Sequence, residues 1–595
     1  MPTENRTRLH WRAGFLAALA TAAFFLGLAE APIERAEIYF LDAARAMVER
    51  SDWLVPYYRG EPFYDKPALT YWLLAVSFDL FGPGLFAGRL VAGLLALATL
   101  GATWHAARRL VRATSGDAEE RSAETAFFAT AILGTSYAFV SFARLTMSDM
   151  LLTLLTLLAG TFYLRSESEG RPRFLVLCGV LLGLAFMTKG PIAWIFFGAL
   201  LLALALVERR LPKILTPEGL VGTISAFAVG LVWFLFVYLR EGVEPLKWFF
   251  LRENLQRFAA RTYDAAEPFW FYLPVYLVEG LPWSILLIPA VLFAFRKDSP
   301  RMLRILVVWS ALMLVPLSLS KGKIDYYLLP LLPPLSIVIG ALLACGEPSS
   351  RLLRLLASVS GLFLLGASAF PMLPPPFAPD PDTIQWMRRF LVLAAIACFA
   401  SAIRPRAKTV VTVGAVSVLG AALFLFGAVV PAYRNAQPTA DFLDHIARER
   451  VFTPGLEVAV CDDTLRLQRD ILFSLRLAVL ERCELWAIAS SSRKFLILVT
   501  EAQERSLRTA ANVRHIATLD HLPADVTRLG TLLAGARVSK VGLLANFETT
   551  DPVARWKRNR EFKRWLDTPE GQEWDAERLE KDRLRDIALR RAGIK

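Results

Sequence analysis

The sequence has 595 residues, of which 55% are hydrophobic, and a formal net charge of +13. Its mean hydropathy is +0.43. A soluble domain of this size does not carry so many apolar runs, so the composition excludes a soluble globular enzyme and indicates a polytopic α-helical membrane protein. The basic residues are divided among short loops between apolar runs, which is typical of membrane topology and not of nucleic-acid binding.

About thirteen apolar runs are long enough to cross a bilayer. They lie near 11–29, 84–107, 123–142, 148–165, 173–188, 191–207, 219–239, 269–295, 302–319, 326–345, 352–372, 387–403 and 408–432. The first run resembles a signal peptide but lacks a convincing cleavage pattern, so we expect it to remain as an anchor. The run at 67–82 is short and carries Asp79, which predicts an interfacial or re-entrant segment.

The positions of the basic residues fix the expected orientation. With the N-terminus in the cytoplasm, the inner loops hold most of the arginines, as the positive-inside rule requires. The outer face then collects the loop at 30–83, the loop at 240–268 and the segment at 318–327. We therefore expect thirteen spans, a cytoplasmic N-terminus and an extracytoplasmic C-terminal region, with any chemistry on the outer face.

The composition changes after the last span, so 1–433 is predicted as the membrane domain and 434–547 as a small extracytoplasmic α/β domain. Its predicted strands are Glu457–Cys461, Lys494–Thr500 and Val538–Leu544, with an amphipathic helix at Thr464–Leu477. The charged segment 548–595 is predicted to be a helical tail. Five cysteines are too few for a disulfide framework, although Cys461 and Cys483 would be free to pair in an exported domain.

The predicted outer face brings acidic, basic and phenolic side chains together. They are Glu37, Asp65, Asp149, Lys66, Arg144, Lys189, Arg257, Lys321, Lys323, Tyr39, Tyr64, Tyr326 and Tyr327. None of the five histidines falls there, which argues against a Ser–His nucleophile and against zinc. A carboxylate-bound divalent cation stays open.

Cations beside carboxylates suit one reaction class. Cations hold a phosphate leaving group, and a carboxylate takes a proton from the attacking group. In a membrane protein this predicts a lipid-phosphate-linked donor. The alternatives are that each cation only reaches for lipid headgroups, that 30–83 is a plain interfacial hairpin, and that Asp149 caps a helix together with Ser148. Lys66, between Asp65 and Pro67 in an aromatic loop, favours the functional interpretation.

Several motifs resemble the ArnT-like lipid-linked glycosyltransferases. The residues that carry this resemblance are Gly60-Glu61-Pro62-Phe63-Tyr64-Asp65-Lys66-Pro67, Ala143-Arg144 with Asp149, Thr188-Lys189-Gly190-Pro191, Pro282-Trp283, and Ser318–Pro330. Members of this family are GT-C fold enzymes related to the protein O-mannosyltransferases. Their type member moves 4-amino-4-deoxy-L-arabinose from undecaprenyl phosphate to lipid A. The resemblance covers about 1–435 and implies a bacterial inner (plasma) membrane protein.

The resemblance also implies roles for single residues. Glu37 and Asp149 would be the catalytic acids, although the first acid of the family's Asp-Glu pair corresponds here to Ala36. The residues implied at the donor phosphate are Lys66, Lys189, Arg257, Lys323, Tyr326 and Tyr327, with Asp65, Arg45, Arg144 and Tyr64 in support. Family members often have a histidine shortly before the segment that is Pro268-Phe269-Trp270 here, and this chain has no histidine at 264–267. A metal site that uses that histidine is therefore not implied here, and Asp65 stays a possible metal ligand.

The sequence therefore predicts a membrane glycosyltransferase that uses a polyprenyl-phosphate sugar, with a pentose or a hexose as the transferred group, and the resemblance implies that the reaction inverts the sugar. Lipid A, another envelope glycan or a protein remains open as the acceptor. A protein O-mannosyltransferase-like enzyme is the nearest alternative. A transporter of lipid-linked sugars is a second, but transporters place ionisable groups near the bilayer midplane and show repeated halves, neither of which is apparent here.

Overall fold

The computed structural model describes the larger part of the chain, in thirteen stretches. They are 2–31, 33–34, 36–58, 60–111, 118–209, 216–259, 267–346, 348–369, 381–431, 457–460, 495–500, 514–521 and 539–545. The chain divides into two compact units, Met1–Met372 with Ala378–Arg434, here called the membrane unit, and Leu373–Phe377 with Asn435–Lys595. The predicted helix Thr464–Leu477, the tail 548–595 and the pair Cys461–Cys483 lie outside the described residues.

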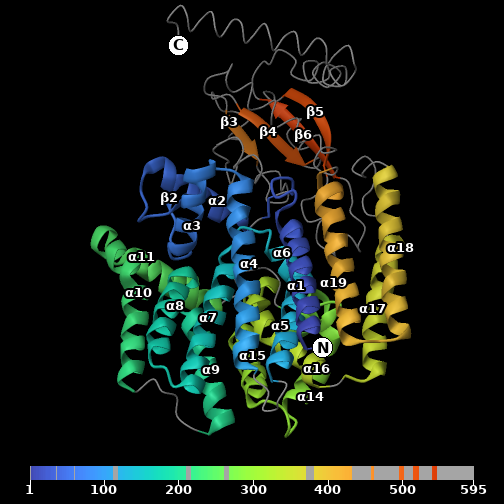
Figure 1. Cartoon of the computed structure of the whole chain (residues 1–595). Helices are drawn as coiled ribbons and strands as arrows, with labels where there is room; N and C mark the ends of the chain where they lie inside the picture. The colour runs from blue at the N-terminus through green and yellow to red at the C-terminus, as the bar shows by residue number, and fades with distance from the viewer. Residues whose placement is uncertain are drawn as a thin grey trace, which may run out of the picture. The chain divides into compact units, whose positions relative to one another are not determined.

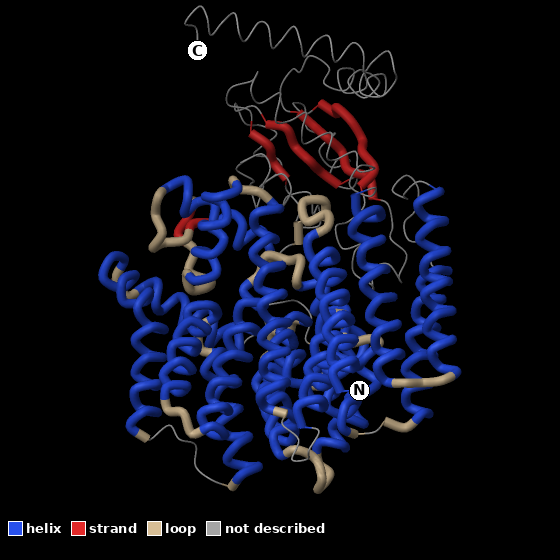
Figure 2. The backbone as a smooth tube through the Cα atoms, in the orientation of Figure 1, coloured by secondary structure: helices blue, strands red, loops and turns tan. Residues whose placement is uncertain are grey.

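The membrane unit is built from helices (Figures 1 and 2). Its long helices are α1 (Pro2–Phe25), α4 (Leu85–Leu110), α5 (Ala118–Gly134), α7 (Ser148–Glu169), α8 (Arg173–Lys189), α9 (Ile192–Glu208), α10 (Pro217–Glu241), α15 (Arg301–Leu319), α16 (Leu332–Cys345), α17 (Ser350–Ala369), α18 (Pro381–Ile403) and α19 (Ala407–Phe424). Each overlaps one predicted span over most of its length, because long apolar runs specify both helix and membrane burial.

The length and composition of these helices make the chain a multi-pass membrane protein. Seven helices among the described residues are long and apolar enough to cross a membrane, or eight if a bent pair is counted as one span. That pair joins α13 (Tyr272–Glu279) to η3 (Trp283–Leu286) and α14 (Leu287–Ala294) at a bend of 115°. The predicted span 123–142 is likewise divided, into α5 and the short α6 (Tyr137–Phe142). The total of thirteen stays a prediction.

Small residues allow the closest helix contact in the membrane unit. On α8, a Cβ added at Gly179 would lie 1.9 Å from the carbonyl oxygen of Gly222 on α10, and one at Gly183 would lie 2.6 Å from Val229. Glycines spaced four apart let two backbones approach, and van der Waals packing then holds the helices together in lipid. α8 and α10 therefore form a tightly packed pair, while α17, α18 and α19 pack together at the other side of the unit (Figure 1).

The predicted loop at 30–83 is ordered into short elements. They are α2 (Glu37–Arg50), the hairpin of β1 (Tyr57–Tyr58) with β2 (Glu61–Pro62), and α3 (Leu69–Phe81). α3 has 13 residues, which is about 20 Å of helix and too short for a bilayer core of about 30 Å. This length agrees with the predicted interfacial or re-entrant segment.

Long-range bonds anchor this loop to α10. Asp52 accepts hydrogen bonds from Arg240 at 2.9 and 2.6 Å. The indole of Trp233 donates to the carbonyl oxygen of Leu54 at 2.9 Å, and the indole of Trp72 donates to that of Trp53 at 2.6 Å. The segment that precedes Asp65 and Lys66 is therefore held in place from two helices.

The second unit contains a four-stranded sheet in the order β3-β4-β6-β5. β3 (Glu457–Val460) is parallel to β4 (Phe495–Thr500), and β6 (Ser539–Ala545) is antiparallel to β4 and to β5 (Arg514–His521). Three of the strands coincide with the predicted ones. β5 was missed because its sequence interleaves Arg514, His515, Asp520 and His521 with apolar residues, which hides the apolar run.

Candidate active site

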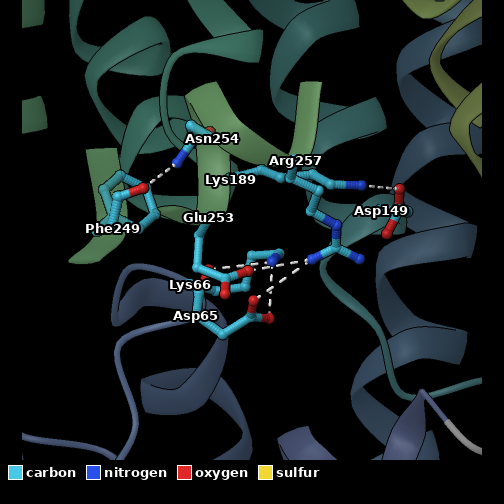
Figure 3. Close-up of polar contacts among 8 residues, drawn as sticks. All are labelled: Asp65, Lys66, Asp149, Lys189, Phe249, Glu253, Asn254 and Arg257. Atoms are coloured by element: carbon cyan, nitrogen blue, oxygen red, sulfur yellow. Dashed lines mark hydrogen bonds and ion pairs between the residues drawn. The ribbon is translucent and has the colours of Figure 1, made fainter. Parts of the chain in front are cut away.

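Asp65 and Lys66 form the first half of the candidate site (Figure 3). Pro67 disfavours a helical conformation for the residue before it, so α3 begins only at Leu69 and Lys66 stays in the loop. The ammonium of Lys66 donates to Oδ2 of Asp65 at 2.7 Å and to the Asp65 carbonyl oxygen at 3.0 Å. The side chains are 16% and 22% exposed, so both charges are partly open.

Arg257 and Glu253 complete this half from a distant part of the chain. They lie on consecutive helical segments, η2 (Trp248–Gln256) and α12 (Arg257–Ala259), which follow α11 (Glu244–Lys247). Nη1 of Arg257 lies 3.5 Å from Oδ1 of Asp65 and 3.2 Å from Oε2 of Glu253. The carboxyl groups of Asp65 and Glu253 also share a hydrogen bond. Two cations and two carboxyl groups therefore form one cluster.

The two carboxyl groups of this cluster ionise differently. Burial and the hydrogen bond that its protonated form donates to Asp65 raise the pKa of Glu253 to about 7. Burial acts against ionisation of Asp65 as well, but the charge of Lys66 and the hydrogen bonds from Glu253 and Lys66 hold the pKa of Asp65 well below its usual range. When Glu253 is protonated, the cluster carries two positive charges and one negative charge, which leaves it attractive to an anion.

Asp149 and Lys189 form the second half of the site. Asp149 lies in the first turn of α7, and Oδ1 accepts a hydrogen bond from Nζ of Lys189 at 2.5 Å. The Asp149 side chain is 5% exposed, and its Oδ2 accepts no hydrogen bond from a described residue. The predicted alternative of a helix cap is not observed here, because α7 has no side-chain cap hydrogen bond and the hydroxyl of Ser148 has no partner among the described residues.

Tyr326 and Tyr327 cover Lys189. Nζ of Lys189 lies 4.3 Å from the ring centroid of Tyr327 and 5.6 Å from that of Tyr326. Both tyrosines belong to η4 (Asp325–Leu331), which packs against α7. Cation–π contacts at these distances stabilise a partly buried ammonium. The tyrosines thus contact the site through Lys189, and their predicted place at the donor phosphate stays a prediction.

Gly190 and Phe249 link the two halves. Gly190 has φ +72° and ends α8 directly after Lys189, a conformation that glycine adopts readily. A Cβ at this position would lie 2.5 Å from the ring of Phe249. The carbonyl oxygen of Phe249 accepts from the side chain of Asn254 at 2.7 Å, next to Glu253. Figure 3 shows the Arg257 guanidinium between Asp65 and the Asp149–Lys189 pair.

Glu37 lies apart from this group in a closed environment. Oε1 accepts from Nε of Arg89 at 3.0 Å and from the Thr146 amide at 2.9 Å. Oε2 accepts from Nη2 of Arg89 at 2.7 Å and from the Glu34 amide at 2.9 Å. Glu37 is 0% exposed and Arg89 is 1% exposed. A carboxylate has about four acceptor positions, so none is left for a substrate, which conflicts with the predicted role as a base.

The charge state of Glu37 agrees with that geometry. Burial alone would raise its pKa, but the charge of Arg89 and the hydrogen bonds from Arg89, Thr146 and Glu34 keep the pKa of Glu37 below its usual range. Glu37 therefore remains ionised and binds protons weakly.

Three further predicted site residues have other contacts. Lys323 donates to the carbonyl oxygens of Ser320 at 2.6 Å and Glu267 at 3.2 Å, so its ammonium is bound to backbone. Arg45 is paired with Asp42 one turn earlier in α2. Arg144 donates to the carbonyl oxygens of Ala23, Phe24 and Gly27 at 2.7, 3.1 and 3.1 Å and covers the Phe426 ring at 3.7 Å. These arginines and Lys323 hold structure together.

Tyr64 faces the anchor at Asp52 and Arg240. Burial, with smaller contributions from Glu241 and Tyr57, raises its pKa to about 12. Its phenol is therefore neutral at physiological pH. Tyr64 directly precedes Asp65 in the loop, and its predicted supporting role stays a prediction.

The side chains of the site fit a divalent cation poorly. The described residues contain no group of three or more His, Cys, Asp or Glu side chains placed to hold a metal. Asp65 and Glu253 supply two carboxyl groups, and Lys66 and Arg257 already bind both. Mg²⁺ prefers oxygen ligands in octahedral geometry, which a charge-neutralised pair does not supply.

The sequence interpretation missed Glu253, Asn254 and Arg89. Glu253 lies four residues before Arg257, and an acid and a base at that spacing share one helix face, so this signal was readable. Arg89 lies just beyond the loop at 30–83, and no local pattern marks it. Its bonds to Glu37 and to the carbonyl oxygens of Leu28 and Ala31, both at 2.8 Å, depend on the tertiary fold.

A family model and several solved structures resemble the chain. The model described as dolichyl-phosphate-mannose-protein mannosyltransferase matches residues 65–234. The crystal structure of ArnT from Cupriavidus metallidurans bound to undecaprenyl phosphate has a TM-score of 0.69 at 20% identity, and the match covers 90% of this chain and 98% of that one. At this identity the likeness shows a shared fold.

Two named relatives match this chain at higher sequence identity than the solved structure does. Undecaprenyl phosphate-alpha-4-amino-4-deoxy-L-arabinose arabinosyl transferase 2 of Pseudomonas fluorescens is 31% identical over 313 residues, so the match spans about half of each protein, 52% of both. Transferase 1 of the same organism is 30% identical over 431 residues, which cover 69% of this chain and 74% of the relative. The chain is therefore a member of the ArnT-like family of GT-C membrane proteins, the family that contains these aminoarabinose transferases.

Proposed function

We propose that the chain is an integral membrane glycosyltransferase that moves a sugar from a polyprenyl-phosphate donor to an envelope acceptor. One observation carries this proposal. The cations Lys66 and Arg257 share a cluster next to Asp149 (Figure 3), whose second oxygen accepts no hydrogen bond from the described residues. A phosphate-holding group and a proton acceptor thus lie side by side, which is what transfer from a phosphate leaving group requires.

Each half of the site performs one part of the transfer. Lys66 and Arg257 bind the donor phosphate and neutralise the charge that develops on it as the bond to the sugar breaks. Asp149 takes the proton from the acceptor hydroxyl, whose oxygen forms the new bond to the anomeric carbon. The phosphate leaves with the electron pair of the broken bond, and the sugar inverts. Lys189 holds the other oxygen of Asp149 through its hydrogen bond and so orients the carboxylate.

The named relatives support the choice of donor. Those relatives are aminoarabinose transferases named for undecaprenyl phosphate, and the solved ArnT was crystallised with that lipid. For this chain we propose an undecaprenyl-type phosphate carrying a pentose such as 4-amino-4-deoxy-arabinose, or a hexose, and lipid A or another envelope glycan as the acceptor. A protein acceptor, as in the protein mannosyltransferases of the matching family model, is the second candidate.

The proposal includes a topology. It has thirteen spans in a bacterial inner membrane, with a cytoplasmic N-terminus and an extracytoplasmic 434–547, so the site faces outward. Every predicted span contains a helix or a broken helix, and the arginines of the loops agree with this orientation. No step uses a divalent cation, because Lys66 and Arg257 already supply the positive charge.

The test is transfer of a radiolabelled sugar from a polyprenyl-phosphate pool to envelope material in reconstituted vesicles. Wild type is compared with Lys66→Ala and Asp149→Asn at equal expression. We expect label on the acceptor with wild type and at least a hundredfold less with Asp149→Asn. Unchanged transfer in both variants would refute the site. Movement of the labelled lipid between leaflets without transfer would support a transporter instead.

A further inference from the structure

The Glu37–Arg89 pair binds the backbone that leads to Asp149. Glu37 accepts from the amide of Thr146, three residues before Asp149, at 2.9 Å. Three residues span at most about 10 Å, so the position of Thr146 limits where Asp149 can lie. Arg89 holds the opposite side of Glu37 and donates to the carbonyl oxygens of Leu28 and Ala31.

Arg144 fixes the same segment at its other end. Its guanidinium donates to the three carbonyl oxygens at the end of α1 and lies over the Phe426 ring. The chain from Arg144 to Asp149 is therefore attached at Arg144 through a side chain and at Thr146 through an amide. Both attachments reach the stretch 23–37, which α4 holds through Arg89.

We propose that Glu37 and Arg89 are positioning residues that hold the segment before Asp149, and that Glu37 exchanges no proton with the acceptor. This inference rests on the proposed function of Asp149. The pair fixes the Thr146 amide, and the amide fixes the start of α7. Asp149 then points its open oxygen toward the Lys66–Arg257 cluster with little freedom to move.

The contacts of Glu37 separate this role from that of a base. All four acceptor positions are filled, and the side chain is completely buried. A proton could reach either oxygen only if a bond to Arg89 or to a backbone amide were broken. The first break would take the carboxylate away from the buried charge of Arg89, and the second would leave a buried amide N–H unsatisfied, and both are unfavourable.

A double-mutant cycle tests the inference. Glu37→Gln, Arg89→Gln and the double variant are compared for melting temperature, donor binding and transfer rate. Each single variant leaves one buried group mismatched, so we expect both single variants to melt lower and to transfer slowly. The double variant removes both charges, and we expect it to transfer about tenfold faster than the slower single variant, since coupled residues depart this far from additivity.

A stable double variant that binds donor but transfers no faster than Glu37→Gln would overturn the proposal, because a missing base is not restored by a second substitution. If the double variant fails to fold, the rate–pH profile of Glu37→Gln decides. A positioning role leaves the acidic limb in place at a lower rate, whereas loss of that limb would identify Glu37 as the base.

Asp52→Asn and Arg240→Gln, alone and together, form the matched control. This pair is also long-range and bidentate, but Arg240 is 46% exposed. The effects of the two single substitutions on the transfer rate should add up to that of the double variant within about twofold. Failure of the proposed function is recognised separately, because wild type would then transfer no label under any condition.

Discussion

Glu37 and Asp149 are both buried acids that pair with a base, and they differ in how many of their acceptor positions are filled. Glu37 receives four hydrogen bonds, two of them from backbone amides. Asp149 receives one, from Lys189, which itself lies against two aromatic rings. The first arrangement is complete without a ligand. The second leaves an oxygen for one, so counting unfilled acceptor positions distinguishes a structural ion pair from a reactive one.

The largest expected effect comes from substitution of Asp149, the acid with an unfilled acceptor position. Asp149→Asn removes the proton acceptor while keeping the shape of the side chain. We expect the transfer rate to fall by about 10²–10⁴-fold, the usual contribution of a general base. Donor affinity should change by less than about threefold, because a different part of the site holds the phosphate.

Equilibrium binding of labelled donor and single-turnover transfer separate these two quantities. Asp298→Asn, an exposed aspartate paired with Arg296, is the control and should leave both unchanged. A loss of donor binding in Asp149→Asn as large as the loss in rate would show that Asp149 belongs to the donor-binding half.

The second effect concerns the phosphate-holding half. A charge-assisted hydrogen bond contributes about 1.5–3 kcal/mol, so Lys66→Ala should weaken donor binding by about 10- to 100-fold. Measurement of donor binding by isothermal titration in detergent gives the affinity directly. Lys321→Ala is the matched control, since Lys321 is exposed in the described structure and its side chain has no partner in this cluster. Equal losses in both variants would mean that only the net charge of the outer face matters.

A smaller effect is expected from pH. With a pKa of about 7, Glu253 is mostly neutral below pH 7 and mostly ionised above it. Ionisation adds a negative charge beside the donor phosphate, so donor affinity should fall several-fold as the pH rises from 6 to 8. Glu253→Gln should remove this dependence and keep the affinity seen at low pH.

Glu244→Gln, in α11 directly before η2 but exposed and paired with Lys247, should leave the pH dependence as it is in wild type. A pH dependence that persists in Glu253→Gln would assign it to another group.

The smallest effect belongs to the exposed anchor of the outer loop. Arg240→Ala breaks the pair with Asp52, and exposed pairs contribute about 0.2–1 kcal/mol to stability. The hydrogen bonds from Arg240 also lower the pKa of Asp52. A carboxylate with a lowered pKa stabilises the fold above its ordinary range and loses that contribution as the pH falls. The difference in melting temperature between wild type and Arg240→Ala should therefore shrink in acid, and a constant difference would contradict this assignment.

The sequence was most informative where residues act close to their neighbours. Asp65 and Lys66 are adjacent and are paired, and the apolar runs became helices because apolar length alone specifies them. The contacts of Glu37 were not readable from the sequence, because they are made to Arg89, 52 residues away, and to the Thr146 amide, 109 residues away. Arg257 reaches Asp65 across 192 residues. Contacts of that range are set by helix packing, and no local pattern encodes them.

Gly190 limits how the two halves of the site can move relative to each other. Its missing side chain is the space into which the Phe249 ring fits, and Phe249 begins the stretch that bears Glu253 and Arg257. A single methyl group at residue 190 would push this stretch outward and carry the guanidinium away from Asp149. The contact acts in both directions, so a displacement of the 248–259 segment would press on Gly190 and on Lys189 beside it. In the proposed reaction, the position of the phosphate-holding cations and that of Asp149 are therefore coupled through one ring and one glycine.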